Sequence, residues 1–133
     1  MSITSTSAHI EEPTVVVVDD DDGMRGALLA LFDAAGFSSV GYASGAALLD
    51  VGLPSGRCCV VLDLDMPGMN GIEVQSALSG RGNPPVVFLS GAASDADRER
   101  ALRAGASSFI AKPASGDCLL DAVEEALAGV AAG

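Results

Sequence analysis

Four short apolar runs in this chain each end in a residue that can take part in chemistry. They are residues 15–18 before Asp19 and Asp20, residues 59–62 before Asp63, residues 86–89 before Ser90, and residues 109–111 before Lys112. Apolar runs of this length, bounded by turn residues, are typical of strands buried on both faces of a parallel sheet. Open α/β folds bind ligands at the carboxyl ends of such strands. We therefore expect three carboxylates, a hydroxyl and the only lysine of the chain to meet along one edge.

Helical periodicity fills the spaces between these runs. We expect helices over about residues 24–35, 44–51, 72–79, 95–104 and 116–128, and a short strand over residues 39–42. Glycine lies at or just past each expected helix end, with Gly129 closing the last helix. This alternation predicts an α/β fold with a five-stranded parallel sheet and helices on both faces. The strand order expected for it is 2-1-3-4-5, as in flavodoxin-like folds.

The same reading divides the chain into three parts. Residues 1–13 are expected to form a flexible tail, residues 14–128 one domain, and residues 129–133 a tail or the start of a linker. The Ser/Thr-rich start lacks the features of a signal peptide, and no apolar run is long enough to cross a bilayer. Three cysteines without metal-ligand spacing are typical of reduced thiols in the cytoplasm. We therefore expect a cytoplasmic protein that does not bind membranes.

The formal net charge of −11 restricts the kinds of partner. It argues against direct nucleic-acid binding, because phosphate backbones are bound by Lys and Arg. It fits a domain that binds cations or basic partners. The alternative is that most of the charge only keeps helix faces solvated, as at Asp121, Glu124 and Glu125.

The polar residues at the strand ends, in this order and spacing, resemble the receiver domain of bacterial two-component response regulators. The matching features are Asp19-Asp20, the segment VLDLDMPGMNG at residues 61–71, Ser90, and Lys112-Pro113. The resemblance covers about residues 14–128. It is strongest to receivers of the FixJ type, which usually precede a helix-turn-helix DNA-binding domain. The implied fold is the (βα)5 receiver fold.

The acidic residues predict a metal site. Three carboxylates at one strand edge repel each other unless a cation lies among them, and oxygen ligands favour Mg²⁺, with Mn²⁺ as a substitute. The resemblance implies that Asp20 and Asp63 bind the metal directly, Asp19 through water, and Asp65 through its main-chain carbonyl. The alternative is that residues 19–22 form a solvated acidic cluster at the start of a helix. We expect this alternative to hold for Asp21 and Asp22.

The resemblance assigns the phosphoryl chemistry as well. Asp63 would accept a phosphoryl group, because Mg²⁺ can neutralise the charge on both reactants. Lys112 would balance the charge of the product, the Ser90 hydroxyl would donate to a phosphoryl oxygen, and the Gly91 backbone would contact it. Ser90 and Phe109 would form the switch. The alternatives are a surface lysine at position 112 and an ordinary core phenylalanine at position 109.

A receiver of this kind implies particular partners. A sensor histidine kinase or a phosphotransfer protein would phosphorylate Asp63, and the surface of the fourth helix and fifth strand would change, controlling a homodimer or an output domain. We expect slow hydrolysis of its own aspartyl phosphate but no turnover of an external substrate. Ala114 departs from the aromatic that often follows the Lys-Pro pair in the family, where the resemblance also implies a cis Lys112–Pro113 bond.

Two other classes fit some of the same residues. Residues 60–65 also resemble the nucleophile motif of haloacid-dehalogenase-type phosphatases, but that family keeps its acidic pair downstream, whereas Asp19-Asp20 lies upstream. The second alternative is a receiver-like interaction module that no longer accepts phosphoryl groups. An EF-hand at residues 20–23 is excluded, because Val18 and Leu29 would occupy ligand positions.

Overall fold

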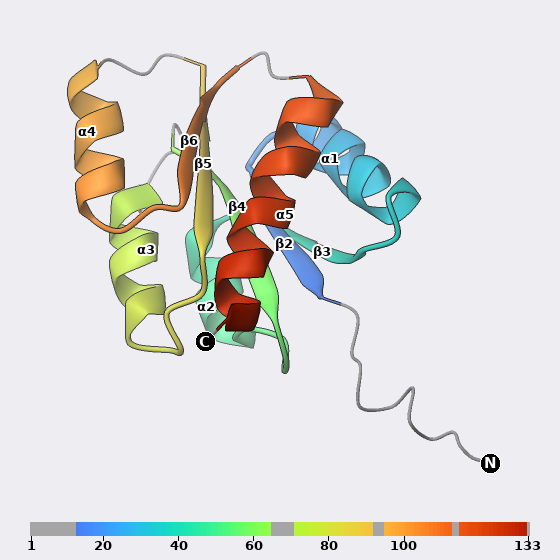
Figure 1. Cartoon of the computed structure of the whole chain (residues 1–133), viewed down its shortest axis with the longest axis horizontal. Coiled ribbons are helices and arrows are strands. Elements are labelled where there is room, and N and C mark those ends of the chain that lie inside the picture. Colours follow the sequence, from blue (N-terminus) through green and yellow to red (C-terminus); the bar gives the residue numbers. More distant parts are fainter. Residues whose placement is uncertain (1–12, 65–70, 92–94, 113–114, 133) are drawn as a thin grey trace.

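The computed structural model of the protein describes residues 13–64, 71–91, 95–112 and 115–132 (Figure 1). The strands are β2 (Thr14–Val18), β3 (Ser38–Tyr42), β4 (Cys58–Asp63), β5 (Val86–Ser90) and β6 (Ser108–Ala111). The helices are α1 (Asp22–Ala34), α2 (Gly45–Val51), α3 (Gly71–Ser79), α4 (Asp95–Arg103) and α5 (Gly116–Ala132). None of these helices has the length and apolar character needed to cross a membrane.

The strands form one parallel sheet of order β3-β2-β4-β5-β6, which confirms the predicted order 2-1-3-4-5. The register places Val18 opposite Leu62, and Ser90 opposite Ala111. Every residue of β4 and β5 is buried. Because the strands are parallel and paired nearly in step, their carboxyl ends lie along one edge of the sheet. The residues that follow the strands are therefore close to one another.

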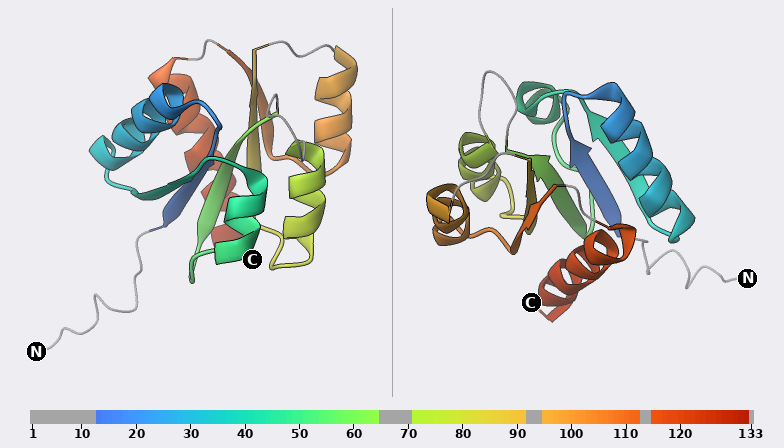
Figure 2. Two further views of the ribbon diagram at one scale, coloured as in Figure 1. Left: turned by 180° about the vertical axis from the view of Figure 1, so that it is seen from behind. Right: turned by 90° about the horizontal axis from the view of Figure 1, so that it is seen from above.

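The helices cover the two faces of the sheet in separate layers, as the view from above shows (Figure 2). Val15 and Val17 of β2 face the layer of α1 and α5, where they pack with Phe32 and Val123. The alternate residues of β2 face the layer of α2, α3 and α4, in a cluster that includes Leu48, Val74 and Ala101. Since both faces of β2 are covered, its apolar residues form a continuous run in the sequence.

Side-chain caps begin three of the helices. Asp21 accepts from the Met24 N–H at the start of α1, Ser44 from Ala47 before α2, and Ser115 from Cys118 at the start of α5, each at 3.1 Å. Each cap satisfies a backbone donor that has no partner within its helix.

The predicted end of the last helix is wrong. Gly129 does not stop α5, which continues to Ala132. A helix-interior glycine costs only about 1 kcal/mol relative to alanine, and alanines at 128, 131 and 132 are the strongest helix formers. Gly36 and Gly52, by contrast, follow α1 and α2 with φ of 96° and 91°, a region that favours glycine. The assignment of residues 129–133 to a tail or linker stays a prediction, and residues 1–12 lie outside the described part of the chain.

The cysteines lie in two different environments. Cys58 and Cys59 are buried in β4, whereas Cys118 is exposed on α5, and all three are free thiols. Burial raises the pKa of Cys59 to about 12, and the neighbouring Cys58 adds to this shift. A thiol with such a pKa stays protonated, which fits a packing role.

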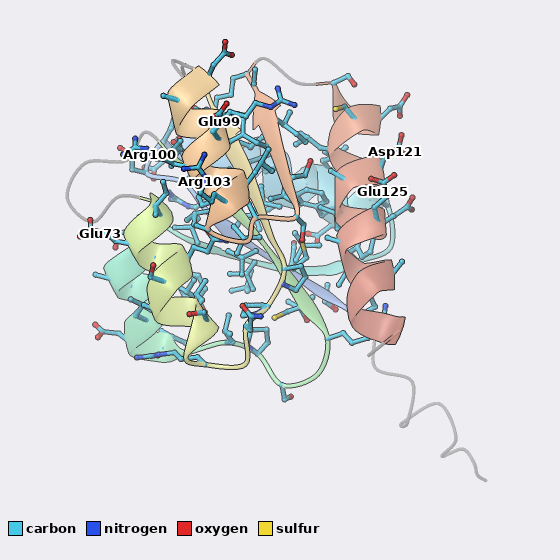
Figure 3. All side chains as sticks on the ribbon, turned by 60° about the vertical axis from the view of Figure 1, so that its left-hand side comes forward. Glu73, Glu99, Arg100, Arg103, Asp121 and Glu125 are labelled. Atoms are coloured by element: carbon cyan, nitrogen blue, oxygen red, sulfur yellow. The ribbon has the colours of Figure 1, made fainter. Side chains whose placement is uncertain are left out.

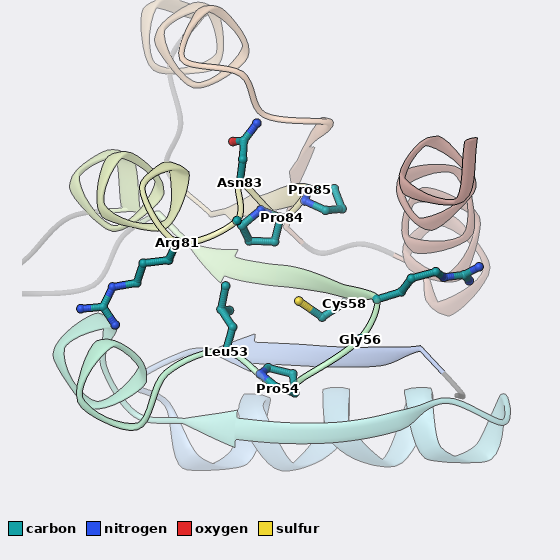
Figure 4. Close-up of a pocket in the computed structure, with 10 residues that line it drawn as sticks. Leu53, Pro54, Gly56, Cys58, Arg81, Asn83, Pro84 and Pro85 are labelled. Atoms are coloured by element: carbon teal, nitrogen blue, oxygen red, sulfur yellow. The ribbon is translucent and has the colours of Figure 1, made fainter. Parts of the chain in front are cut away.

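A hollow of about 160 Å³ lies at the amino-terminal edge of the sheet (Figure 4). Leu53, Pro54, Cys58, Arg81, Pro84 and Pro85 are among the residues that line it. It lies at the edge opposite the strand ends that carry the predicted site residues. No carboxylate is among its lining residues, so it is separate from the predicted metal site.

Close packing at the start of α3 leads to a stability prediction. A Cβ at Gly71 would lie 2.7 Å from Phe88 Cε1, 3.0 Å from Leu64 Cδ1 and 3.3 Å from Leu64 Cα. Phe88 is fully buried, so its ring has little room to move. We expect Gly71→Ala to lower the free energy of unfolding by about 1–3 kcal/mol in urea denaturation. Gly26→Ala is the control, because nothing lies within 4 Å of its Cβ position. Equal stabilities of the two variants would contradict the prediction.

Candidate functional site

Three aspartates meet at the carboxyl edge of the sheet. Asp19 and Asp20 follow β2, and Asp63 is the last residue of β4. One carboxylate oxygen from each lies within 4.8 Å of the others. Asp19 is 1% and Asp63 4% exposed, whereas Asp20 faces solvent. The predicted cluster is therefore present, with two buried carboxylates and one accessible one.

Lys112 lies against the two buried carboxylates. Its Nζ is 3.3 Å from Asp63 Oδ2 and 3.8 Å from Asp19 Oδ2, and its side chain is 24% exposed. The main-chain N–H of Lys112 donates to the Ser90 carbonyl at 2.8 Å, which continues the pairing of β5 with β6 beyond the end of β6. The lysine is thus held at the acidic site, where it pairs with two buried carboxylates.

The carboxylate of Asp19 is only partly satisfied. Its Oδ1 accepts from the Asp21 N–H at 2.9 Å, but its buried Oδ2 has no hydrogen-bond partner among the described residues. Burial raises the pKa of Asp19, and the Asp63 charge adds to the rise, while the Asp21 N–H and Lys112 oppose it. At 3.8 Å the Lys112 ammonium acts through its charge and not through a hydrogen bond. A buried carboxylate oxygen without a donor is costly, and a cation would relieve that cost.

The donor set of this cluster fits a hard divalent cation. All three side chains offer carboxylate oxygens, which Mg²⁺ and Mn²⁺ accept, and the exposed Asp20 leaves a side open for water ligands. The acidic cluster can therefore hold a metal ion. Asp65, predicted as a fourth ligand through its carbonyl, lies outside the described residues.

The next two acidic residues belong to the helix start, as predicted. Asp21 is the N-cap of α1, and Asp22 pairs with Arg25 one turn later. Both are exposed. They serve the first turn of α1 and are not among the residues that form the cluster.

The remaining predicted residues lie on β5 and β6. Ser90 ends β5 and is 1% exposed, and Gly91 follows it at the surface. Phe109 is paired with Phe88 in the sheet and is 8% exposed, within the cluster that faces α2, α3 and α4. Its ring is therefore inside the core in this structure. Pro113 and Ala114 lie outside the described residues, and so does the Lys112–Pro113 bond.

Arg25 also belongs to the site, and its contact there was not predicted from the sequence. Arg25 of α1 donates from Nη1 to the main-chain carbonyl of Asp19 at 2.8 Å. The available signal was a basic residue three positions after Asp22 in a strongly acidic chain, a spacing that predicts an ion pair on a helix. That spacing does not predict the contact with the carbonyl.

The fold and the site together define a class of signalling domain. Residues 15–124 match the response regulator receiver domain, and the chain belongs to this family.

Two curated relatives are transcriptional regulators. FixJ of Azorhizobium caulinodans is 35% identical over 118 residues, which cover 88% of this chain and 56% of that protein. The C4-dicarboxylate transport regulator DctR of Rhodobacter capsulatus is 37% identical over 119 residues, covering 86% of this chain and 60% of that protein. This chain therefore spans little more than half the length of these relatives.

Solved structures agree with this assignment. The response regulator StyR has a TM-score of 0.80 and 39% identity, over 88% of this chain and 60% of that one. The structure of FixJ-N has a TM-score of 0.77 and 29% identity, over 87% of this chain and 94% of that one. The predicted resemblance to FixJ-type receivers is confirmed.

Proposed function

We propose that this domain accepts a phosphoryl group on Asp63 from a sensor histidine kinase or a phosphotransfer protein, in a reaction that requires Mg²⁺ or Mn²⁺. The observation that carries the proposal is the position of Asp63, buried at the end of β4 with the Lys112 ammonium 3.3 Å away and two further carboxylates beside it. Such a carboxylate has both a cation site and a fixed counter-charge within reach.

The residues divide the work of the reaction. Asp19, Asp20 and Asp63, with the Asp65 carbonyl, would hold the metal, which when bound neutralises charge on the acceptor and on the incoming phosphoryl group. A carboxylate oxygen of Asp63 forms the new bond to phosphorus while the bond to the donor nitrogen of phosphohistidine breaks. Lys112 and the Ser90 hydroxyl then bind phosphoryl oxygens, together with the Gly91 backbone.

The product would change the surface near the site. The aspartyl phosphate adds close to two negative charges, which draw Ser90 and Lys112 toward them. Ser90 is next to β6 in the sheet, and Phe109 of β6 is buried in this structure. We propose that the hydrogen bond to Ser90 stabilises the buried position of Phe109, and that the surface of α4 and β6 changes with it.

The exposed side of α4 carries charges of both signs. Glu99, Arg100 and Arg103 project from α4 (Figure 3), with an ion pair of 3.6 Å between Arg103 and Glu99. The α4 residue Leu102 is 42% exposed. A face carrying both signs can pair with its own copy, so we propose that it forms a homodimer or contacts an output domain.

The wider role follows from the relatives and the charge. Because FixJ and DctR are named transcriptional regulators, we propose that this domain controls transcription in the cytoplasm through a partner or an attached domain. We also propose that this chain does not bind nucleic acid directly, because its net charge of −11 would repel the phosphate backbone. We further propose that it hydrolyses its own aspartyl phosphate slowly and turns over no external substrate.

Intact-mass spectrometry with acetyl phosphate tests the function. We expect one phosphoryl group per chain in the presence of Mg²⁺ and none when EDTA removes the metal, because the acceptor and donor charges are then uncompensated. Repeated turnover of varied phosphoesters would favour the phosphatase class. A chain that stays unmodified with Mg²⁺ and excess donor would favour the interaction module that no longer accepts phosphoryl groups.

A further inference from the structure

We infer that Arg25 is a positioning residue for the metal site, which holds the turn between β2 and α1 so that Asp19 presents one free carboxylate oxygen to the cation. This inference rests on the proposed metal role of Asp19, Asp20 and Asp63. Arg25 itself is not a ligand, because a guanidinium has no lone pair to offer.

The polar atoms of Asp19 are fixed almost completely by the surrounding chain. Its N–H donates to the Tyr42 carbonyl at 3.1 Å, and its carbonyl accepts from Arg25 Nη1 at 2.8 Å. Its Oδ1 accepts from the Asp21 N–H at 2.9 Å. Only Oδ2 is left, and it faces Lys112 at 3.8 Å. Arg25 therefore supplies one of the three bonds that determine where that oxygen points.

The second nitrogen of the guanidinium orients the first. Arg25 Nη2 donates to Asp22 Oδ1, whose side chain is 89% exposed. An exposed pair of this kind contributes little to stability. The effect of the pair with Asp22 is geometric. The guanidinium group is planar, so the bond from Nη2 to Asp22 orients Nη1 toward the Asp19 carbonyl. Lysine has no such planar group and cannot reproduce both contacts in one plane.

A glycine in the edge strand makes room for this arrangement. A Cβ at Gly41 of β3 would lie 3.1 Å from both Cγ and Cδ of Arg25 and 2.9 Å from Leu29 Cδ1. Gly41 is not among the described residues with positive φ, so its backbone would accept alanine. Space for the Leu29 side chain and for the Arg25 stem together explains the glycine, and the coupling of Gly41 to Arg25 can be measured separately.

The sign of the effect on Mg²⁺ separates positioning from charge. A positive guanidinium near a cation site repels the cation, so removing it would tighten binding if charge alone mattered. If Arg25 positions Asp19, removing it weakens binding. Loss of a group that orients a metal ligand typically weakens affinity about 10- to 100-fold.

Titration calorimetry with Mg²⁺ alone measures this sign. We expect Arg25→Met, which keeps an apolar stem beside Gly41, to raise the dissociation constant about tenfold or more. Arg25→Lys should fall between Arg25→Met and the parent. Arg57→Met is the matched control, because it makes the same change in net charge at an exposed position just before β4, at the opposite edge of the sheet, and its affinity should equal that of the parent. Arg25→Met that binds Mg²⁺ as tightly as the parent, or more tightly, would overturn the inference.

Two further variants separate this inference from the metal role and from folding. Asp20→Asn should abolish most Mg²⁺ binding, and if the parent itself binds no Mg²⁺, the proposed metal role fails and the inference with it. A different outcome separates the two ideas. If the parent binds Mg²⁺, Asp20→Asn loses that binding, and Arg25→Met keeps the affinity of the parent, then the metal role stands and only the inference about Arg25 fails. Circular dichroism in EDTA shows whether Arg25→Met folds without metal. If it does not fold, Arg25→Lys is used in its place, and an Mg²⁺ affinity equal to that of the parent in Arg25→Lys would overturn the inference.

A double-mutant cycle tests the link to Gly41. Gly41→Ala should weaken Mg²⁺ binding several-fold in the parent, because its Cβ displaces the Arg25 stem. The same change should cost less in an Arg25→Ala background, where the stem is absent. Equal fold-changes in the two backgrounds would show that Gly41 does not act through Arg25 and would overturn the pairing.

Discussion

Asp63→Asn will abolish phosphoryl acceptance. The amide has the same shape as the carboxylate, so the contact with Lys112 and the packing of β4 are retained, but a neutral amide is not a nucleophile toward phosphorus. Borohydride traps an acyl phosphate chemically, and peptide mapping after acetyl phosphate treatment with Mg²⁺ should find the trapped residue at position 63 alone. The loss of label in the variant should be complete, because Asp63 is the proposed acceptor.

Two other aspartates provide the controls for this experiment. Asp121→Asn changes an exposed carboxylate of α5 (Figure 3) and should be labelled like the parent. Asp20→Asn should be labelled slowly, since it removes a proposed metal ligand and leaves the acceptor in place. Label that persists undiminished in Asp63→Asn would show that another residue accepts the phosphoryl group.

Activation by beryllofluoride and Mg²⁺ will convert monomers into dimers, and Ser90→Ala will weaken that response. A hydrogen bond from Ser90 to a charged group contributes about 1.5–3 kcal/mol, which corresponds to a roughly 10- to 150-fold shift between two states. Because Phe109 is already only 8% exposed, further burial of its ring adds little. Ser90 is therefore expected to carry most of the shift, with Lys112 supplying the rest.

Sedimentation velocity of activated and non-activated samples measures this response. Ser55→Ala, at an exposed serine between α2 and β4, is the control and should dimerise like the parent. Ser90→Ala should still accept phosphoryl at Asp63, which separates the switch from the chemistry. A parent that remains monomeric at high concentration after full activation would contradict the homodimer and favour a different partner for the surface of α4 and β6.

The strands and the acidic cluster were predictable because burial leaves a direct record in the sequence. A parallel strand covered on both faces has to be apolar throughout, so its end is visible where the first polar residue appears, as at Asp19 and Asp63. Parallel pairing then places those strand ends at the same edge of the sheet, independently of the conformation of the loops. The same rule brings Lys112 to this edge but does not place it beside the carboxylates, because β5 lies between β4 and β6 and the lysine side chain has to reach across it.

Contacts that depend on tertiary packing were not predictable. The bond from Arg25 to the Asp19 carbonyl joins a side chain to a main-chain atom six residues away, and no residue pattern marks a carbonyl as an acceptor. The burial of Phe109 was not predictable either, because β6 is an edge strand and an apolar residue on it can lie in the core or at the surface. Gly129 looked like a helix end because glycine usually weakens helices, but the alanines around it offset that cost.

The order of the site residues along the chain has a consequence for protein synthesis. Asp19, Asp20 and Asp63 emerge from the ribosome well before Lys112, which follows the last strand of the sheet. A nascent chain that has made β2 and β4 but not β6 therefore carries the clustered carboxylates without their ammonium, and their repulsion opposes early docking of those strands. Asp63 therefore gains its ion pair with Lys112 only when the final strand is in place.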